Sequence, residues 1–191
     1  MIRLLSDTTI SAIRYGKGSL ANLAAEIEAE LIEKGAAENF PLISRPIEIL
    51  SGSAVAVSCA LTDVDEVLTS FTIPAGTLGV NSILQIEPLW TFGGSVNNKI
   101  LKVKIGVVTV YSATRTTSVK EAPLFVLANR NSLSSQIKPY DNAYITAGSG
   151  APEIYTIDFS KNRTVNITGQ RANAGDSLTL EYYRILHFIG E

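Results

Sequence analysis

The segment 70–105 combines three extended stretches with two tight turns, and it constrains the fold more than any other part of the sequence. In its last stretch, 100–105, the apolar residues Leu101, Val103 and Ile105 alternate with Lys102 and Lys104. A period of two is typical of an antiparallel strand with one buried face. Pro74 ends the first stretch, because proline cannot donate to a β-ladder, and glycines follow where the chain reverses. The segment therefore predicts consecutive antiparallel strands.

The same pattern continues from Ile47 to the end of the sequence, without helical periodicity between the strands. Short alternating strands separated by turn signals predict a sandwich or barrel, and their number in 47–191 fits a jelly roll. The predicted fold is mainly β, a jelly-roll-like antiparallel β-sandwich. An immunoglobulin-like connectivity is the alternative, but no Cys–Trp–Cys spacing supports it. The expected strands are 47–50, 54–61, 67–73, 83–92, 100–111, 124–128, 154–159, 164–167 and 177–188.

Ahead of the strands, 19–34 is the one strong helix signal. Ser19 can cap its start and Gly35 fits the position after its end, with alanine, leucine and glutamate dominating between them. Four apolar residues spaced four, three and four apart form the seam of a short coiled coil, which predicts an interface between copies of the chain. Leucine at a with isoleucine at d favours trimers or tetramers over dimers, and a homotrimer is expected. The alternative is an amphipathic helix packed on its own domain. The seam residues are Leu20, Ala24, Ile27 and Leu31.

These signals divide the chain into four parts: an N-terminal attachment arm over 1–18, an oligomerisation helix over 19–35, a linker over 36–46 and the sandwich over 47–191. Prolines in the linker favour extended geometry. The arm mixes apolar and basic side chains and is expected to contact a larger body. A loosely ordered terminus is the alternative. The expected contact residues of the arm are Ile2, Arg3, Leu4, Leu5 and Arg14.

The composition argues against several classes of function. Sixteen basic and eighteen acidic residues give a net charge of −2, without the basic excess of a nucleic-acid coat. The single cysteine, Cys59, rules out an intrachain disulfide and a cysteine-cluster zinc site, and it is expected to be a small buried hydrophobe. No run approaches the roughly 18 apolar residues of a membrane span, and no secretory signal opens the chain. We expect a soluble protein made in a cytoplasm, with neither nucleic acid nor membrane as partner.

Catalytic chemistry has few candidates in this sequence. The only histidine, His187, lies in an apolar terminal strand and is expected to be structural, because no glycine-flanked serine elbow accompanies it. Asp63, Asp65 and Glu66 cluster, but they lack the glycine and the distal glutamate of a helix–loop–helix calcium loop, and a solvated turn is expected. Trp90 is expected in the core. The sequence therefore predicts no catalytic, metal or cofactor site and no enzyme.

Sugar recognition uses exposed aromatic rings beside polar groups. The longest segment without a strand signal, 129–150, is expected to hold a long loop. Its aromatic and polar residues are the candidate surface for a sugar ligand, and they are Tyr140, Asp141, Asn142 and Tyr144.

The stretch FTIPAGTLG at 71–79, a strand containing LW, and NNKILKVKIG at 97–106 together resemble a pattern found in tailed-bacteriophage virion proteins. These proteins include head fibres, capsid decoration proteins and tail fibre modules. The resemblance implies a non-enzymatic virion structural protein, made in the host cytoplasm. The expected form is a trimeric head fibre or decoration protein, attached through its N-terminus to the major capsid protein or another virion protein. The alternative is a tail fibre or receptor-binding module that recognises a host surface glycan.

Overall fold

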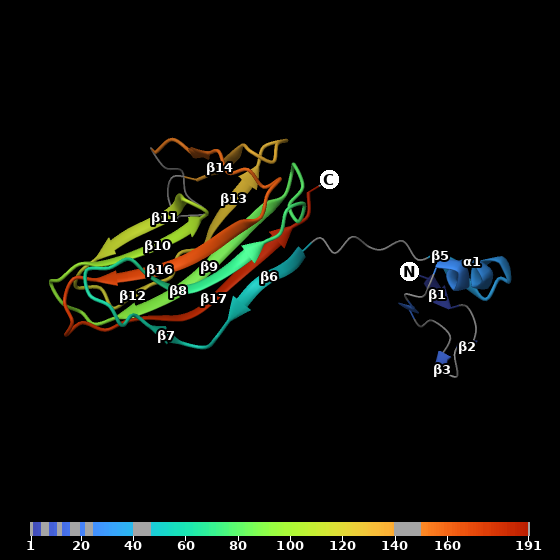
Figure 1. Ribbon diagram of the computed structural model, residues 1–191, viewed down its shortest axis with the longest axis horizontal. Coiled ribbons are helices and arrows are strands. Elements are labelled where there is room, and N and C mark those ends of the chain that lie inside the picture. The colour runs from blue at the N-terminus through green and yellow to red at the C-terminus, as the bar shows by residue number, and fades with distance from the viewer. Residues whose placement is uncertain are drawn as a thin grey trace. The chain divides into compact units, whose positions relative to one another are not determined.

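A computed structural model describes residues 2–4, 8–10, 13–15, 20–21, 25–39, 47–139 and 150–190. The chain divides into two compact units, Met1–Arg45 and Pro46–Glu191 (Figure 1). The second unit holds most of the described residues and all of the surfaces analysed below.

The first unit contains short strands and the one helix found among the described residues. Its three-stranded sheet has the order β4 (Leu20–Ala21), β1 (Ile2–Leu4) and β5 (Ala37–Asn39), and β2 (Thr8–Ile10) pairs with β3 (Ile13–Tyr15). The helix α1 runs over Ala25–Glu33. Within the described residues, no helix is long and apolar enough to cross a bilayer.

The helix is shorter than expected, and one seam residue lies outside it. Leu20 belongs to β4, where it pairs with Arg3 of β1. The expectation of a helical Leu20 is therefore wrong, because a β-ladder takes up the backbone there. Ile27 and Leu31 lie on α1 and are half-buried, whereas Ala24 is outside the described residues. The expected linker also begins later, since its residues 37–39 form β5, which pairs with β1.

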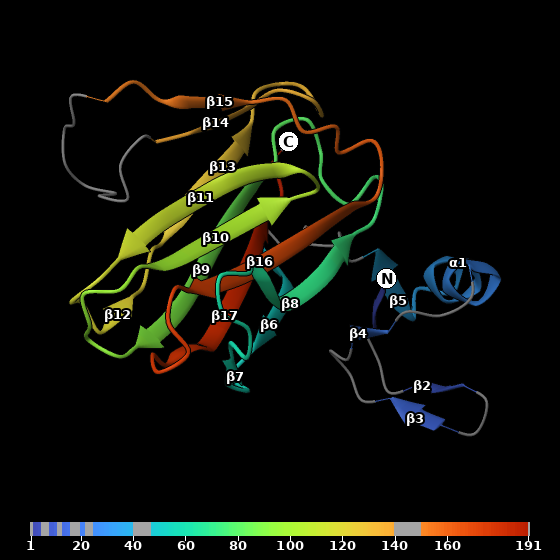
Figure 2. The same cartoon turned by 60° about the vertical axis from the view of Figure 1, so that its left-hand side comes forward.

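The second unit is built from two antiparallel sheets (Figure 2). The four-stranded sheet has the order β11 (Val108–Arg115), β10 (Lys99–Ile105), β16 (Arg163–Arg171) and β8 (Glu66–Ile73). The eight-stranded sheet follows the path β15 (Glu153–Tyr155), β14 (Gln136–Lys138), β13 (Phe125–Asn129), β9 (Ile83–Phe92), β17 (Leu178–Phe188) and β6 (Ile47–Ser53). In addition, β12 (Lys120–Glu121) pairs with β9, and β7 (Val57–Ser58) pairs with β17.

The mainly β class and the antiparallel sandwich are confirmed. The division of strands differs from the four and four of a jelly roll, because the described strands of this unit divide into four and eight. The last two strands enter different sheets: β16 lies between β10 and β8, and β17 lies between β9 and β6. Each of the two sheets therefore contains strands from both the early and the late parts of this unit's sequence.

The stretch 100–111 was expected as one strand and forms a hairpin instead. Gly106 has a φ of 60°, a left-handed conformation that glycine adopts without strain, and Ile105 pairs with Val108 across the turn. Val107 at the tip is 99% exposed. Because apolar residues flank Gly106 on both sides, the sequence pattern did not indicate a turn there.

The core lies between the two sheets and contains the alternating residues that the sequence pattern predicted. Leu101, Val103 and Ile105 of β10 are buried against β9 and β17 residues such as Ile86 and Ile185. Trp90 is fully buried, which confirms its expected place in the core. Its ring stacks on Tyr111 at a centroid distance of 6.2 Å, and Tyr111 stacks on Phe125 at 5.4 Å.

Candidate functional site

The acidic cluster at the start of β8 connects strands of the four-stranded sheet. The Asp65 carboxylate forms ion pairs with Lys102, at 3.1 Å, and Lys104, and it accepts a hydrogen bond from the Thr168 hydroxyl at 2.6 Å. Burial alone would raise the pKa of Asp65, but these partners together hold it below its ordinary value. Groups of three or more metal-ligating side chains are absent from the described residues. The expected solvated turn is thus wrong for Asp65, which joins β10 and β16.

Glu66 is also structural, and so is the cysteine beside it. The Glu66 carboxylate accepts the backbone N–H groups of Ala60 and Leu61, both at 2.8 Å, and the Cys59 thiol at 3.1 Å. The Leu61 N–H is the main reason that the pKa of Glu66 is lowered. Burial, with help from the Glu66 charge, raises the pKa of Cys59 to about 11. Cys59 is buried, as expected, and its thiol is protonated at neutral pH, so it is a poor nucleophile.

The structure brings together a serine, a histidine and a carboxylate that are far apart in sequence. His187 Nε2 lies 2.8 Å from Ser82 Oγ, and His187 Nδ1 lies 3.4 Å from the Glu48 carboxylate. This is the order of groups in a hydrolytic triad. Sequence analysis missed it, because Ser82 has no flanking motif and reaches His187 only through the pairing of β9 with β17.

Burial prevents this arrangement from reaching a substrate. Ser82 and His187 are each 2% exposed, and neither lines the two pockets described below. Ser82 Oγ also accepts the N–H of Gly79 at 2.8 Å, so the hydroxyl closes the turn before β9. Glu48 is exposed and its contact is long. The three residues therefore fasten a turn to β17, in accord with the structural role expected for His187.

The outer face of the eight-stranded sheet carries a continuous line of apolar residues, which we call the apolar row. Register pairs connect one residue from each of six strands, from β6 through β17, β9, β13 and β14 to β15. Alternate neighbours of these residues, such as Leu84 and Leu127, are buried in the core, so the row faces outward. The apolar row consists of Ile47, Phe188, Ile83, Ala128, Ile137 and Ile154.

A second line beside the apolar row is also largely apolar. It runs through Ile49, Leu186, Gln85 and Val126 in register. The most exposed side chain on this part of the face is Ile49, at 71%. The two lines together form a surface that we call the apolar face.

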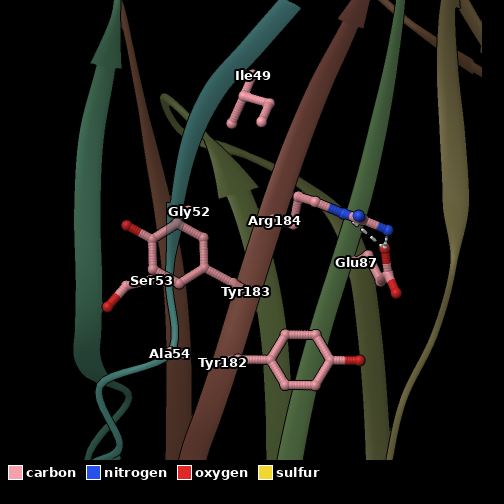
Figure 3. A pocket seen from close by; sticks show the side chains of 8 residues that line it. All are labelled: Ile49, Gly52, Ser53, Ala54, Glu87, Tyr182, Tyr183 and Arg184. Carbon is pink, nitrogen blue, oxygen red and sulfur yellow. Dashed lines mark hydrogen bonds and ion pairs between the residues drawn. The ribbon is translucent and has the colours of Figure 1, made fainter.

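An open groove of about 600 Å³ borders the apolar face at β6 (Figure 3). Arg184 of β17 binds Glu87 of β9 through a 2.6 Å ion pair across the strands, and the Tyr182 side chain lies beside this pair in Figure 3. Gly52 is the register partner of Arg184 and also lines this groove.

The outer face of the other sheet has the opposite character. Its corresponding register line is Thr109, Lys104, Asn166 and Ser70, which are all polar. An antiparallel sheet normally presents polar residues on its solvated face. Along this line the four-stranded sheet follows the rule, whereas the eight-stranded sheet departs from it along the apolar row.

A smaller polar pocket, of about 240 Å³, lies between β11 and the strands β14 and β15. The buried Lys138 amino group is 2.9 Å from the Glu153 carboxylate, which also accepts the Tyr155 hydroxyl. Burial would raise the pKa of Glu153, but Tyr155 and Lys138 lower it below its ordinary value. Lys138 and Glu153 are register partners on either side of the segment 139–152.

The predicted glycan surface of that loop, Tyr140 to Tyr144, lies outside the described residues. Of the predicted arm contacts, Leu5 also lies outside them, and the others belong to β1 and β3. Sequence analysis did not predict the apolar face. One signal was present: Ile83 and Leu84 are adjacent on one strand, so one of them must point away from the core.

Comparison with known proteins identifies no family. No family model matches the chain, and no curated protein matches it. Among solved structures, the CBM2 module of the evolved Dit of Lactobacillus casei BL23 phage J-1 is similar over 64% of this chain and 70% of that chain, with 16% identity and a TM-score of 0.30.

Two chains of infectious bursal disease virus are similar at the same level. The Gt strain chain has 15% identity and a TM-score of 0.31, with 99% of this chain and 43% of that chain covered. The Gx strain chain has 15% identity and a TM-score of 0.27, with coverages of 93% and 47%. This chain therefore spans less than half the length of either viral chain. At these TM-scores the likenesses carry no argument about function.

Proposed function

We propose that this chain is a virion structural protein that acts by contact and not by catalysis. The observation that carries the proposal is the apolar face, because the largest contiguous apolar surface of a soluble protein is often a site of contact with another molecule. The sequence resemblance of 71–106 to tailed-bacteriophage virion proteins supplies the setting. The titratable groups analysed above support the non-enzymatic part, since Asp65, Glu66 and His187 are each engaged in a structural contact.

In its finer form, the proposal is a homotrimeric head fibre or capsid decoration protein attached through its N-terminal unit. The separation of residues 1–45 as a compact unit is compatible with attachment at one end. Ile27 and Leu31 on α1 are the remaining helical candidates for contacts between copies. Major capsid protein or another virion protein is the partner of the first unit in this proposal.

A second candidate function is a tail module that binds a host surface glycan. The polar pocket of Lys138, Glu153 and Tyr155 favours it, because an ionised carboxylate and a hydroxyl can bind sugar hydroxyl groups. The predicted surface, Tyr140 to Tyr144, follows Lys138 in the sequence.

Immunogold labelling of purified particles tests both functions. Antibodies against the full chain, applied to virus particles from a lysate in which the chain is made, are expected to label the heads. Labelling of the tail tip would replace the head proposal with the second candidate. Particles that carry no label, with the protein remaining in the soluble fraction, would contradict a virion role.

The non-enzymatic part has its own test at Ser82. A fluorophosphonate probe, which forms a covalent bond with an activated serine hydroxyl, is expected to leave the folded protein unmodified, because Ser82 is buried and its oxygen accepts the Gly79 N–H. Intact-mass analysis after incubation measures the modification, and a Ser82→Ala variant is the matched control. An adduct on the wild-type chain that is lost in this variant would show that the triad is active.

A further inference from the structure

We propose that the polar pocket between β11 and the strands β14 and β15 binds one uncharged sugar ring through its hydroxyl groups. This inference deepens the second candidate function, on which it rests for the origin of the sugar, by naming the chemical class and the size of the ligand. It involves neither the apolar face nor the first unit.

The pocket lies between the free edges of the two sheets (Figure 2). β11 is the last strand of the four-stranded sheet and β15 is the last strand of the eight-stranded sheet, and residues of both line the pocket. The register between β10 and β11 shifts here, so Val110 is an extra residue without a partner in β10. Its carbonyl oxygen lies 3.5 Å from the Tyr155 hydroxyl oxygen. Such bulges are frequent at sheet edges beside functional sites, because they direct groups of the strand out of the ladder.

The volume of the pocket suits a single sugar ring. Its 240 Å³ is several times the space of about 30 Å³ that one water molecule occupies. Pockets that enclose a drug-sized ligand are larger, at about 300–1,000 Å³. The pocket therefore has room for one small ring, and a longer chain attached to that ring would extend into solvent.

The charges of the pocket cancel, which favours an uncharged ligand. Among the described residues that line it, only Lys138 and Glu153 are charged, and they form an ion pair at 2.9 Å. The Lys138 side chain is 4% exposed, so a ligand anion would have to displace the Glu153 carboxylate from a buried ammonium group. A ligand cation would have to compete with Lys138 for the same carboxylate. A neutral ligand leaves the ion pair in place.

The hydrogen-bonding groups of the pocket call for a ligand that donates from neighbouring hydroxyls. Lys138 and Tyr155 both bind Glu153 Oε2, and within the described residues Glu153 Oε1 receives no hydrogen bond. The Glu153 side chain is 34% exposed, and an ionised carboxylate only accepts hydrogen bonds. Burial and the hydrogen bond to Glu153 raise the pKa of Tyr155, so its hydroxyl keeps its proton and its oxygen is also an acceptor.

A sugar ring matches this arrangement because it carries hydroxyls on adjacent carbon atoms. One hydroxyl can donate to Glu153 Oε1 while its neighbour donates to the Tyr155 oxygen. The exposed hydroxyls of Thr109 and Ser112, which also line the pocket, can donate to the sugar oxygens in return. An amide group of a peptide offers its donors from one nitrogen and would satisfy fewer of these groups.

Titration of the full chain with sugars, followed by two-dimensional amide NMR, tests the proposal. The probes are glucose, galactose, mannose, rhamnose and N-acetylglucosamine, each as the free sugar and as its methyl glycoside. At least one of them is expected to bind at millimolar concentration and to shift the amide signals of residues 109–112 and 153–155. Binding of methyl glycosides supports the end of a glycan chain as the source, and binding of free sugars alone supports a soluble sugar.

Methyl glucuronide tests the expected neutrality of the ligand. It carries a carboxylate where methyl glucoside carries a hydroxymethyl group, and this charge would lie near the ionised Glu153. Methyl glucuronide is therefore expected to bind more weakly than the uncharged probes that bind. Tighter binding of the glucuronide than of every uncharged probe would overturn the proposed ligand class.

Substitutions in the pocket test the residues. Glu153→Gln is expected to weaken sugar binding at least about tenfold, because a charged hydrogen-bond acceptor is lost. Tyr155→Phe keeps the ion pair and is expected to weaken binding about threefold or more, so it keeps the test decisive if Glu153→Gln does not fold. Circular dichroism checks folding. Equal affinity of the wild type and the folded pocket variants would overturn the proposal.

Tyr182→Phe is the matched control. It removes the same hydroxyl from another partly exposed tyrosine, which lies in the groove at β6 and outside the pocket. Its sugar affinity is expected to equal that of the wild type.

Failure of this inference is distinct from failure of the functions proposed above. If none of the sugars binds, or if the shifted signals all lie outside the pocket, the pocket is not a sugar site. Immunogold labelling would be unaffected, because it reports the location of the chain and not its ligand. Tail-tip labelling without sugar binding at the pocket would retain the tail location and overturn only the ligand.

Discussion

Replacing Lys99 with methionine is expected to lower the free energy of unfolding by about 3 kcal/mol, although the two side chains have similar length and volume. Lys99 is fully buried at the start of β10. Its amino group donates to the carbonyl groups of Asn97, at 3.0 Å, and Thr116, at 2.8 Å, and it also contacts Ser95. Methionine would leave these carbonyl groups without their donor. Each buried acceptor that loses its partner costs about 1–3 kcal/mol, reduced where the loop opens to water.

Urea unfolding followed by far-ultraviolet circular dichroism measures this change. Lys102→Met is the matched control, because Lys102 lies on the same strand but is partly exposed and shares Asp65 with Lys104. Its loss is expected to cost no more than about 1 kcal/mol, as for other exposed ion pairs. Equal effects of the two substitutions would show that the Lys99 contacts with the loop ends do not stabilise the fold.

Lys99 shows which features the alternating sequence pattern can predict and which it cannot. The pattern correctly placed Leu101, Val103 and Ile105 in the core, and the same parity puts Lys99 inward as well. The alternation alone could not show that this inward-facing lysine would find hydrogen-bond acceptors for its amino group. The acceptors come from the turn before β10 and from Thr116, which follows β11, and only the β10–β11 hairpin brings them together.

Register across a sheet was the main information that the sequence could not supply. The apolar row depends on five successive register pairs, and those of β6 with β17 and of β17 with β9 join strands that are distant in the chain. A shift of one residue in any pair would turn that strand's apolar side chains to the other face. Local patterns therefore predicted the sandwich but not the apolar face. The same reason explains why Ser82 and His187, 105 residues apart, were not recognised as neighbours.

The N-terminal region shows the limit of helix propensity as a predictor. The segment 19–34 is rich in good helix formers, yet α1 begins only at Ala25. Residues 20–21 pair instead with β1, so a tertiary ladder outweighs the local preference, which amounts to less than about 1 kcal/mol per residue. Of the four predicted seam positions, Ile27 and Leu31 remain on the helix.

Truncating Trp90 to alanine is expected to have the largest effect of any single substitution considered for this chain, a loss of about 3–5 kcal/mol in the free energy of unfolding. The indole is 0% exposed at the centre of the sandwich, and its ring is stacked on Tyr111 with an angle of 14° between the planes. Alanine would leave a large cavity and would remove one end of the stack that continues to Phe125. Urea unfolding must be followed by circular dichroism, because Trp90 is the only tryptophan.

A Trp90→Phe variant distinguishes the contribution of the ring from that of the indole nitrogen. Trp90 Nε1 is buried and has no hydrogen-bond partner among the described residues. Phenylalanine keeps an aromatic ring against Tyr111 and removes this unpaired donor, whose burial costs about 1–3 kcal/mol. The smaller ring leaves a cavity that acts in the opposite direction. The two effects nearly offset each other, so the phenylalanine variant is expected to lose about 1 kcal/mol or less. A loss as large as that of the alanine variant would mean that Nε1 is in fact hydrogen-bonded, and that the indole is held by a polar contact as well as by its stack on Tyr111.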